Sequence, residues 1–146
     1  MRVAIASDHA GLAMKTDLVA ALEGLRVAFD DLGTHDAASV DYPDYAKRVA
    51  DAVLGGTADL GVLVCGSGIG MSITANKFHG IRAALCHTEF DARMSRAHND
   101  ANVLCLGQRA TGAGVARGIL EVFLAGKFEG GRHATRVSKI AALEKP

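Results

Sequence analysis

The sequence lacks several features that would mark it as a membrane, secreted or nucleic-acid-binding protein. Apolar residues make up 49% of the 146 residues, but no apolar run is long enough to cross a bilayer. The N-terminal segment carries one charge, Arg2, and turns polar at Asp8, too early for a signal peptide. Basic and acidic residues balance at 16 each without a block of like charge, which argues against a broad nucleic-acid-binding surface. These absences predict a cytoplasmic protein that binds neither membranes nor nucleic acid.

Cysteine is scarce and unpaired. The three cysteines, Cys65, Cys86 and Cys105, are odd in number and never form a C-x-x-C pair. This pattern argues against both a disulfide framework and a zinc site, so we expect free thiols and no bound metal. A chain of 146 residues can bury a sufficient core without either kind of support. We therefore interpret residues 1–146 as one domain.

Short apolar segments alternate with segments of helical periodicity along the whole chain. Strands are predicted at residues 3–6, 25–29, 60–64, 82–86 and 103–106, and helices at about 12–25, 42–54, 69–76, 88–98, 112–124 and 132–143. Strands that are apolar on both faces and alternate with helices require a parallel sheet covered on both sides. The expected fold is a three-layer α/β/α sandwich, with a Rossmann-like five-stranded parallel sheet and an additional C-terminal helix.

Two of the predicted helices carry clear signals for their start and their buried face. Thr88 with Asp91 three residues later forms a variant of the capping box at the start of the helix 88–98. The apolar side chains expected to face the core from this helix and from the helix 112–124 are Phe90, Met94, Ala97, Val115, Ile119, Val122 and Phe123.

Polar residues gather directly after the predicted strands. These segments are Ser7-Asp8-His9, Cys65-Gly66-Ser67-Gly68, Cys86-His87 and Gly107-Gln108-Arg109. In open parallel sheets, ligands bind beyond the carboxyl ends of the strands, where the strand order reverses. The sequence therefore predicts a ligand site at this edge of the sheet.

The glycine-rich turn that starts at Cys65 offers two interpretations. Its alternating glycines free backbone N–H groups to point at one spot near a helix N-terminus, as in an anion cradle; a tight turn with a structural cysteine explains it equally well. A dinucleotide fingerprint and a C-x5-R phosphatase loop both fail because position 71 is Met71, and the Gly-Lys-Ser/Thr of a P-loop is absent. A thiol at the head of a helix remains, where the helix dipole and nearby amides favour the thiolate as a base or nucleophile.

Three further groups have both a catalytic or binding interpretation and a structural one. His98, before Asn99, could exchange protons near pH 7 or only contact the last carbonyls of its helix. Arg132 and Arg136 share a helix face, either as a phosphate site or as a solvated basic surface. Arg109 is a third candidate for phosphate.

The pair Asp8-His9 follows the first predicted strand and could serve a ligand or the fold. It could orient sugar hydroxyls and meet a phosphate, or Asp8 could cap the first helix.

Taken together, an ordered set of segments resembles the ribose-5-phosphate isomerase B family, which also includes galactose-6-phosphate and allose-6-phosphate isomerases. The segments are Ser7-Asp8-His9-Ala10-Gly11, Asp41-Tyr42-Pro43, Cys65-Gly66-Ser67-Gly68-Ile69-Gly70, Ala75-Asn76-Lys77, Gly80-Ile81-Arg82-Ala83, His98-Asn99-Asp100-Ala101-Asn102-Val103-Leu104 and Gly130-Gly131-Arg132-His133. No single segment is decisive, but the ordered set over most of the chain is highly specific.

The resemblance implies an aldose–ketose isomerase of the non-oxidative pentose phosphate pathway that needs no metal and no cofactor. D-ribose 5-phosphate and D-ribulose 5-phosphate would interconvert through a cis-enediol. Cys65 would take the proton from C2 and return it to C1, His98 would help to open the furanose ring, and Ser67 would assist proton movement between O1 and O2. Some relatives use a glutamate six residues after this cysteine; here that position is Met71 and the cysteine is present, so the thiol version applies.

The resemblance also assigns binding roles and an assembly. Substrate-binding positions match Asp8, His9, Asn99 and the turn residues Gly66, Gly68, Ile69 and Gly70, and the phosphate clamp matches Arg109, Arg132 and Arg136. The family builds each site from two subunits, which implies a homodimer or a homotetramer. Two alternatives stay open: the same chemistry on a tetrose phosphate, allose 6-phosphate or galactose 6-phosphate, and a non-catalytic phosphosugar-binding domain.

Overall fold

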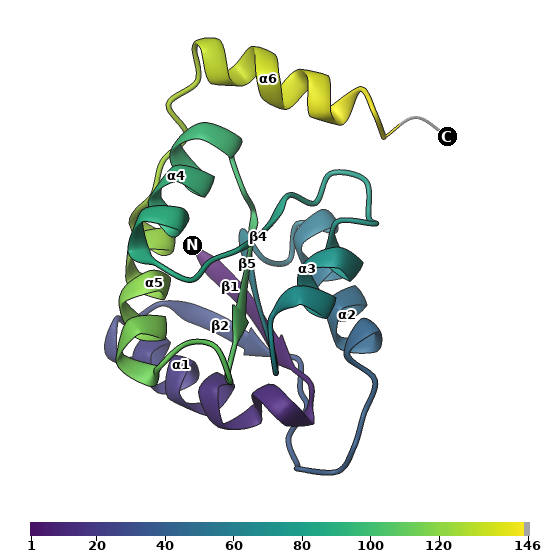
Figure 1. The fold of residues 1–146 in the computed structure, drawn as a ribbon, viewed down its shortest axis with the longest axis vertical. Coiled ribbons are helices and arrows are strands. Elements are labelled where there is room, and N and C mark those ends of the chain that lie inside the picture. The colour runs from purple at the N-terminus through teal and green to yellow at the C-terminus, as the bar shows by residue number, and fades with distance from the viewer. Residues whose placement is uncertain (145–146) are drawn as a thin grey trace.

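The chain folds around one five-stranded parallel sheet with the strand order β2-β1-β3-β5-β4 (Figure 1). In the computed structural model, which describes residues 1–144, the strands are β1 (Arg2–Ser7), β2 (Ala28–Asp31), β3 (Leu60–Cys65), β4 (Ala83–Leu85) and β5 (Val103–Gly107). Every residue of β3 and β5 is buried, because helices cover both faces of the sheet. The predicted parallel sheet is confirmed.

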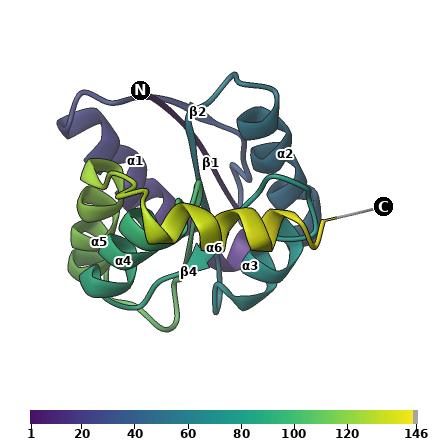
Figure 2. The same cartoon turned by 90° about the horizontal axis from the view of Figure 1, so that it is seen from above.

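Helices form a layer on each face of the sheet (Figure 2). The helices α1 (Leu12–Gly24), α4 (Glu89–Asn99) and α5 (Ala113–Ala125) cover one face, and α2 (Tyr42–Leu54) and α3 (Ile69–Ala75) cover the other. The predicted three-layer α/β/α sandwich is therefore confirmed. Within residues 1–144, none of the helices is both long and apolar enough to cross a membrane.

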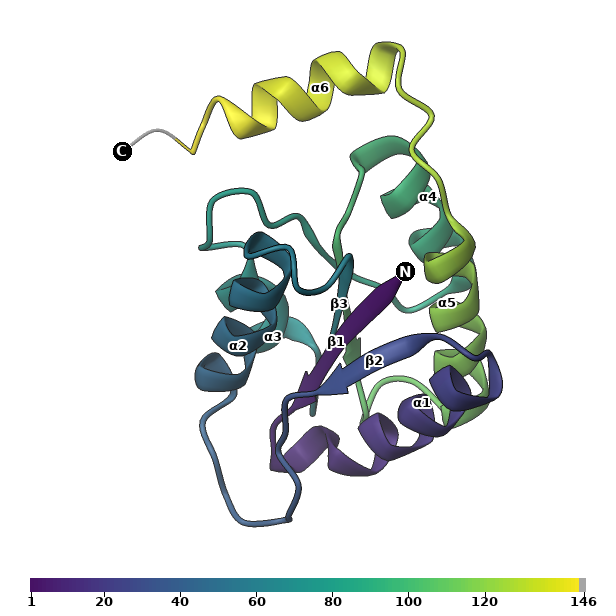
Figure 3. The same ribbon diagram turned by 180° about the vertical axis from the view of Figure 1, so that it is seen from behind.

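The last helix, α6 (Arg132–Ala141), lies outside both layers. It runs across the edge of the sheet at which the strands begin, next to the end of α4 (Figures 1 and 3). His133 in its first turn is buried. The additional C-terminal helix is thus present, and it stands at the opposite edge from the carboxyl ends of the strands.

The second strand begins later than the predicted segment 25–29. Helix α1 ends at Gly24, and Leu25 caps it with helical torsion angles and 41% exposure. Arg26 then has a left-handed backbone with φ of 57°, a conformation that ends a helix and that residues other than glycine rarely adopt. The strand therefore starts at Ala28.

Two large side chains that the periodicity predicted to face the core, one on α4 and one on α5, are exposed. Phe90 is 64% exposed and Val115 is 52% exposed, so the prediction that both face the core is wrong. The buried residues of α4 are Ala92, Ser95 and Ala97. Small side chains at the contact let α4 approach its neighbours closely. The helical spacing of apolar residues had instead predicted that Phe90 faces the core.

Other predictions for these two helices are confirmed. The N–H of Asp91 donates to Oγ1 of Thr88 at 3.1 Å, and the N–H of Thr88 donates to the Asp91 carboxylate at 3.0 Å, which completes the capping box. In α5, Ile119 and Phe123 are fully buried, and Val122 packs against the same core.

Candidate active site

A pocket of about 630 Å³ opens at the carboxyl ends of the central strands (hereafter the strand-end pocket). The strand order reverses between β1 and β3, and such a reversal leaves a crevice for a ligand. The lining residues are Asp8, His9, Ala10, Tyr42, Cys65, Gly66, Ser67, Ile69, Gly70, Ile73, Arg109 and Ala110. The pocket therefore lies at the edge that the sequence predicted, although Cys86-His87 after β4 does not line it.

Cys65 is the last residue of β3 and begins the turn into α3. It is 4% exposed, and its Sγ accepts a hydrogen bond from the backbone N–H of Gly68 at 3.1 Å. Gly68 has a φ of +78°, and a Cβ at this position would lie only 2.5 Å from Leu85. Both the torsion angle and the lack of space therefore require glycine here. The turn therefore directs an amide donor at the sulfur.

Ser67 and Arg109 line the same pocket as Cys65. The Oγ of Ser67 accepts the N–H of Ile69 at 3.3 Å, so its own hydrogen can be donated to a ligand. The backbone N–H of Arg109 donates to the C=O of Gly66 at 2.9 Å, which holds the start of the β5 loop against the turn. A Cβ on Gly66 would lie 3.4 Å from a guanidinium nitrogen of Arg109, so a positive charge lies beside the turn.

Asp8 and His9 enter the pocket from the short 3-10 turn His9–Gly11 after β1. Asp8 is 6% exposed and accepts the N–H of Gly11 through Oδ1 at 3.0 Å, so it caps this turn. The Nδ1 of His9 accepts the N–H of Val40 at 3.2 Å. Because Nδ1 is the acceptor, neutral His9 carries its proton on Nε2. His9 can therefore donate an N–H to a ligand in the strand-end pocket.

All three cysteines are free, as the sequence predicted, but two of them lie in the core. Cys86 and Cys105 are 0% exposed. Burial raises the pKa of Cys86 to about 11, and burial also raises the pKa of Cys105. Cys65 is the cysteine that reaches the pocket.

The remaining predicted site residues lie at the other edge of the sheet. His98 and Asn99 end α4 just before β5 begins, and Arg132 and Arg136 lie on α6. The ring of His98 stacks on that of His133 with centroids 4.0 Å apart and planes 5° from parallel. This second group therefore gathers around the junction of α4 and α6.

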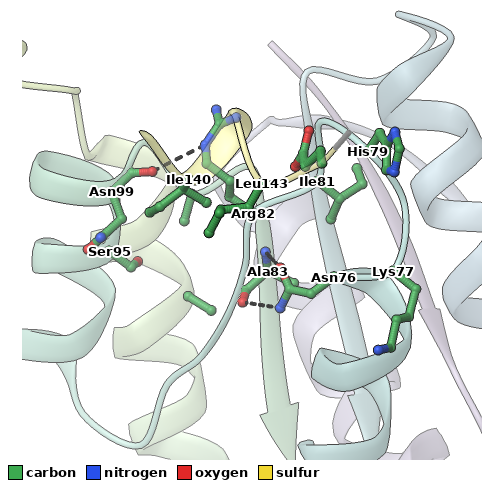
Figure 4. Close-up of a pocket in the computed structure, with 13 residues that line it drawn as sticks. Asn76, Lys77, His79, Ile81, Arg82, Ala83, Ser95, Asn99, Ile140 and Leu143 are labelled. Atoms are coloured by element: carbon green, nitrogen blue, oxygen red, sulfur yellow. Dashed lines mark hydrogen bonds between the residues drawn. The ribbon is translucent and has the colours of Figure 1, made fainter. Parts of the chain in front are cut away.

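A second hollow of about 550 Å³ lies beneath α6 (Figure 4). Asn99, Ile140 and Leu143 are among its lining residues. Arg82 also lines it, but its guanidinium is engaged with the carboxylate of Asp100 at 2.9 Å. The hollow thus presents apolar side chains beside one predicted substrate-binding residue, Asn99.

A single copy of the chain does not bring all predicted site residues together. Strand β3 has six residues and so spans about 20 Å. The strand-end pocket with Cys65 lies at the carboxyl ends of the strands. Helix α4, which carries His98 in its last turn, ends beside the edge at which the strands begin (Figures 1 and 3). Within one chain, the sheet separates these two residues.

Tyr42 lines the pocket, although its sequence pattern predicted no role in the site. It begins α2 and is 39% exposed. A Cβ on Gly70 would lie 2.6 Å from Cζ of Tyr42, so the tyrosine ring lies directly against Gly70. The segment Asp41-Tyr42-Pro43 did contribute to the family resemblance, but its spacing indicated only a helix start.

Comparison with known sequences assigns the chain to one family over nearly its whole length. The model of the family described as ribose/galactose isomerase matches residues 3–140. A putative sugar phosphate isomerase of Bacillus subtilis is 48% identical over 146 residues, which cover 99% of this chain and 98% of the relative. Ribose-5-phosphate isomerase B of Escherichia coli is 46% identical over 144 residues, which cover 99% of this chain and 97% of that protein.

Solved structures agree with this assignment. The chain is similar to ribose-5-phosphate isomerase B of Clostridium thermocellum, with a TM-score of 0.97 and 49% identity over 99% of this chain and 97% of the other. The type B ribose 5-phosphate isomerase of Trypanosoma brucei gives a TM-score of 0.94 and 49% identity over 97% of each chain. The chain belongs to the ribose/galactose isomerase family.

Proposed function

We propose that the protein is an aldose–ketose isomerase that interconverts D-ribose 5-phosphate and D-ribulose 5-phosphate, with Cys65 as the base. The observation that carries the proposal is the thiol of Cys65, which lines the strand-end pocket and accepts a backbone N–H from its own turn. Family membership supplies the reaction class, and the relatives named ribose-5-phosphate isomerase B supply the substrate. Residues 1–146 would act as one domain in the cytoplasm, where thiols stay reduced.

The reaction begins with opening of the furanose ring. His98 donates a proton to the ring oxygen as the bond between this oxygen and C1 breaks, and the proton of the O1 hydroxyl passes to water. The product is the open-chain aldehyde, and His98 regains its proton from water. An imidazole suits this step because it exchanges protons near neutral pH.

Isomerisation then moves one carbon-bound proton. The Cys65 thiolate removes the proton from C2, and the electron pair of that bond forms the C1–C2 double bond of an enediolate with its charge on O1. Ser67 relays the O2 proton to O1, the thiol of Cys65 returns its proton to C1, and C2 becomes the ketone. Backbone N–H groups from Gly66 to Gly70 stabilise the enediolate, in the manner of an oxyanion hole.

A complete site would need two copies of the chain. Cys65 and His98 lie at opposite edges of the sheet in one copy, about 20 Å apart by the length of the strands. Large apolar side chains are exposed at both edges: Ile69 and Ile73 line the strand-end pocket, and Ile140 lies on α6. A homodimer, or a homotetramer made of such dimers, would cover these side chains and join the two halves of the site.

The phosphate would be held by groups from both copies. Arg109 and the Nε2–H of His9 belong to the strand-end pocket, and Arg132 and Arg136 would come from the second copy. One guanidinium group can donate two parallel hydrogen bonds to two oxygens of a phosphate. Binding energy from this end of the substrate positions C1 and C2 against the thiolate of Cys65.

The test is a coupled assay of ribose 5-phosphate conversion with added chelator, comparing the wild type with Cys65→Ala. We expect rapid conversion by the wild type and a loss of about 100-fold or more in the variant, because a general base contributes at least this much. An inactive wild type would refute the pentose substrate. Full activity of the variant would refute the role of Cys65.

A further inference from the structure

Three side chains from three segments meet at the amino-terminal edge of the sheet. His98 lies in the last turn of α4, His133 in the first turn of α6, and Glu129 in the segment that joins α5 to α6. The backbone N–H of Glu129 donates to the C=O of Ala97 at 3.0 Å, which ties this segment to the end of α4. The cluster is therefore part of the fold of one chain and needs no second copy.

The two rings differ in exposure and share one carboxylate. They stack with centroids 4.0 Å apart and planes 5° from parallel. The Oε2 of Glu129 lies 3.7 Å from Nε2 of His98 and 3.9 Å from Nε2 of His133. The side chain of His133 is 9% exposed, whereas that of His98 is 36% exposed. The buried ring of His133 packs against the ring of His98, which is exposed enough for a ligand to reach it.

The surrounding charges distinguish the two histidines. Burial lowers the pKa of His133, and the positive charges of His98, Arg132 and Arg136 lower it further, partly opposed by Glu129. A neutral His133 can stack on a protonated His98, whereas two charged rings would repel each other. The carboxylate of Glu129 adds one negative charge beside the two stacked histidines and the arginines of α6.

We propose that Glu129 and His133 are positioning residues for His98 in the opening of the sugar ring. His133 fixes the plane of the His98 ring by stacking. The carboxylate of Glu129, 3.7 Å from Nε2 of His98, fixes which way that nitrogen faces. Both residues act through His98, so the inference rests on the proposed function.

The same three residues do not form a good metal site. Their donor atoms lie within 4.8 Å of one another, a spacing that a metal ion could use. An imidazole binds a metal ion in its ring plane, however, and two stacked parallel rings share no such point. Arg132 and Arg136 add positive charge at the same place, which further disfavours a cation.

A pair of assays separates ring opening from proton transfer. Conversion of ribose 5-phosphate needs both steps. Ribulose 5-phosphate cannot close to a furanose, because its O5 carries the phosphate. In D₂O, incorporation of deuterium at C1 of ribulose 5-phosphate therefore needs Cys65 but no ring opening, and nuclear magnetic resonance measures it directly.

The variants are Glu129→Gln and His133→Ala, with His133→Phe to restore a stacking ring and Glu23→Gln, an exposed glutamate in α1, as the control. We expect Glu129→Gln and His133→Ala each to lower ribose 5-phosphate conversion about 10-fold. The loss should be smaller than that for a missing general acid, because His98 itself is still present. Deuterium incorporation should stay within about 2-fold of the wild type, because proton transfer at carbon does not use His98. His133→Phe and Glu23→Gln should keep most of the conversion.

Equal losses in both assays, or no loss of conversion, would overturn the positioning roles. A wild type that neither converts ribose 5-phosphate nor exchanges deuterium would instead refute the proposed function itself. If His133→Ala does not fold, Glu129→Gln decides the matter, because the side chain of Glu129 is 62% exposed and its loss leaves the core intact.

Discussion

At the scale of single residues, Cys65, Cys86 and Cys105 share a side chain but not an environment. Cys65 lines the strand-end pocket, whereas the other two are fully buried. Burial raises the pKa of Cys86 to about 11, so at pH 8 only about one thiol in a thousand would be ionised there. The chain thus has one cysteine that can react with a molecule from solution.

We expect iodoacetamide at pH 8 to modify Cys65, and we expect isomerase activity to be lost at the rate at which Cys65 is modified. Peptide mapping by mass spectrometry should find Cys86 and Cys105 unmodified until the protein is unfolded. Modification of either buried thiol ahead of Cys65 would contradict this account of the three environments.

Lys15 shows what the sequence pattern could not predict at this scale. It lies next to Met14 on α1 and is 2% exposed, with its Nζ 2.6 and 2.7 Å from the two carboxylate oxygens of Asp31. A buried lysine is tolerated only with such a partner. Nothing in the spacing of apolar residues marks Lys15, because its partner is 16 residues away on another element.

Asp31→Asn should lower the free energy of unfolding by about 3–5 kcal/mol, because it leaves the buried ammonium without its partner charge. Lys15→Met should cost less, since Asp31 stays 26% exposed and still accepts the N–H of Gly33. Urea denaturation at pH 7 measures both. A larger loss for Lys15→Met than for Asp31→Asn would argue against a buried charge as the cause.

At the scale of elements, the turn between β3 and α3 was predictable and the surroundings of His98 were not. The run from Leu60 to Val64 and the glycines after Cys65 are local signals, so the strand, the turn and the thiol could all be identified. Glu129 is a single acidic residue in a connecting segment, without periodicity. Only the docking of this segment and α6 on the end of α4 brings Glu129 and His133 to His98.

The docking of α6 has a consequence for stability at acid pH. Burial lowers the pKa of His133 below its ordinary value of 6.5, with His98, Arg132 and Arg136 adding to the effect. The unfolded chain therefore binds more protons than the folded chain as the pH falls through 6.5. His133 thus makes the folded state less stable below this pH.

We expect the free energy of unfolding to rise from pH 5 to pH 7, and to rise less in His133→Phe than in the wild type. Urea denaturation at several pH values measures this slope. Val115→Phe, a change to the same side chain at an exposed residue of α5 that does not titrate, is the control and should keep the wild-type slope. Identical slopes for the wild type and His133→Phe would show that His133 does not titrate as described.

At the scale of the whole molecule, the sequence predicted the layers and the edge of the sheet that carries the pocket. Both follow from apolar strands that alternate with helices, and from polar residues after β1, β3 and β5. The position of α6 did not follow, because periodicity identifies a helix and its apolar face but not the surface on which it docks. For this reason the sequence could not show that Arg132 and Arg136 lie at the opposite edge from Arg109.

The central claim is that each site joins Cys65 of one copy to His98 of another. Cys65→Ala and His98→Asn should each lose most of the activity. Refolded as a mixture, they should regain about a quarter of the wild-type activity, because half of the dimers are mixed and each mixed dimer has one intact site. If native mass spectrometry finds mixed dimers and no activity returns, the claim that the two residues meet across a subunit interface is wrong.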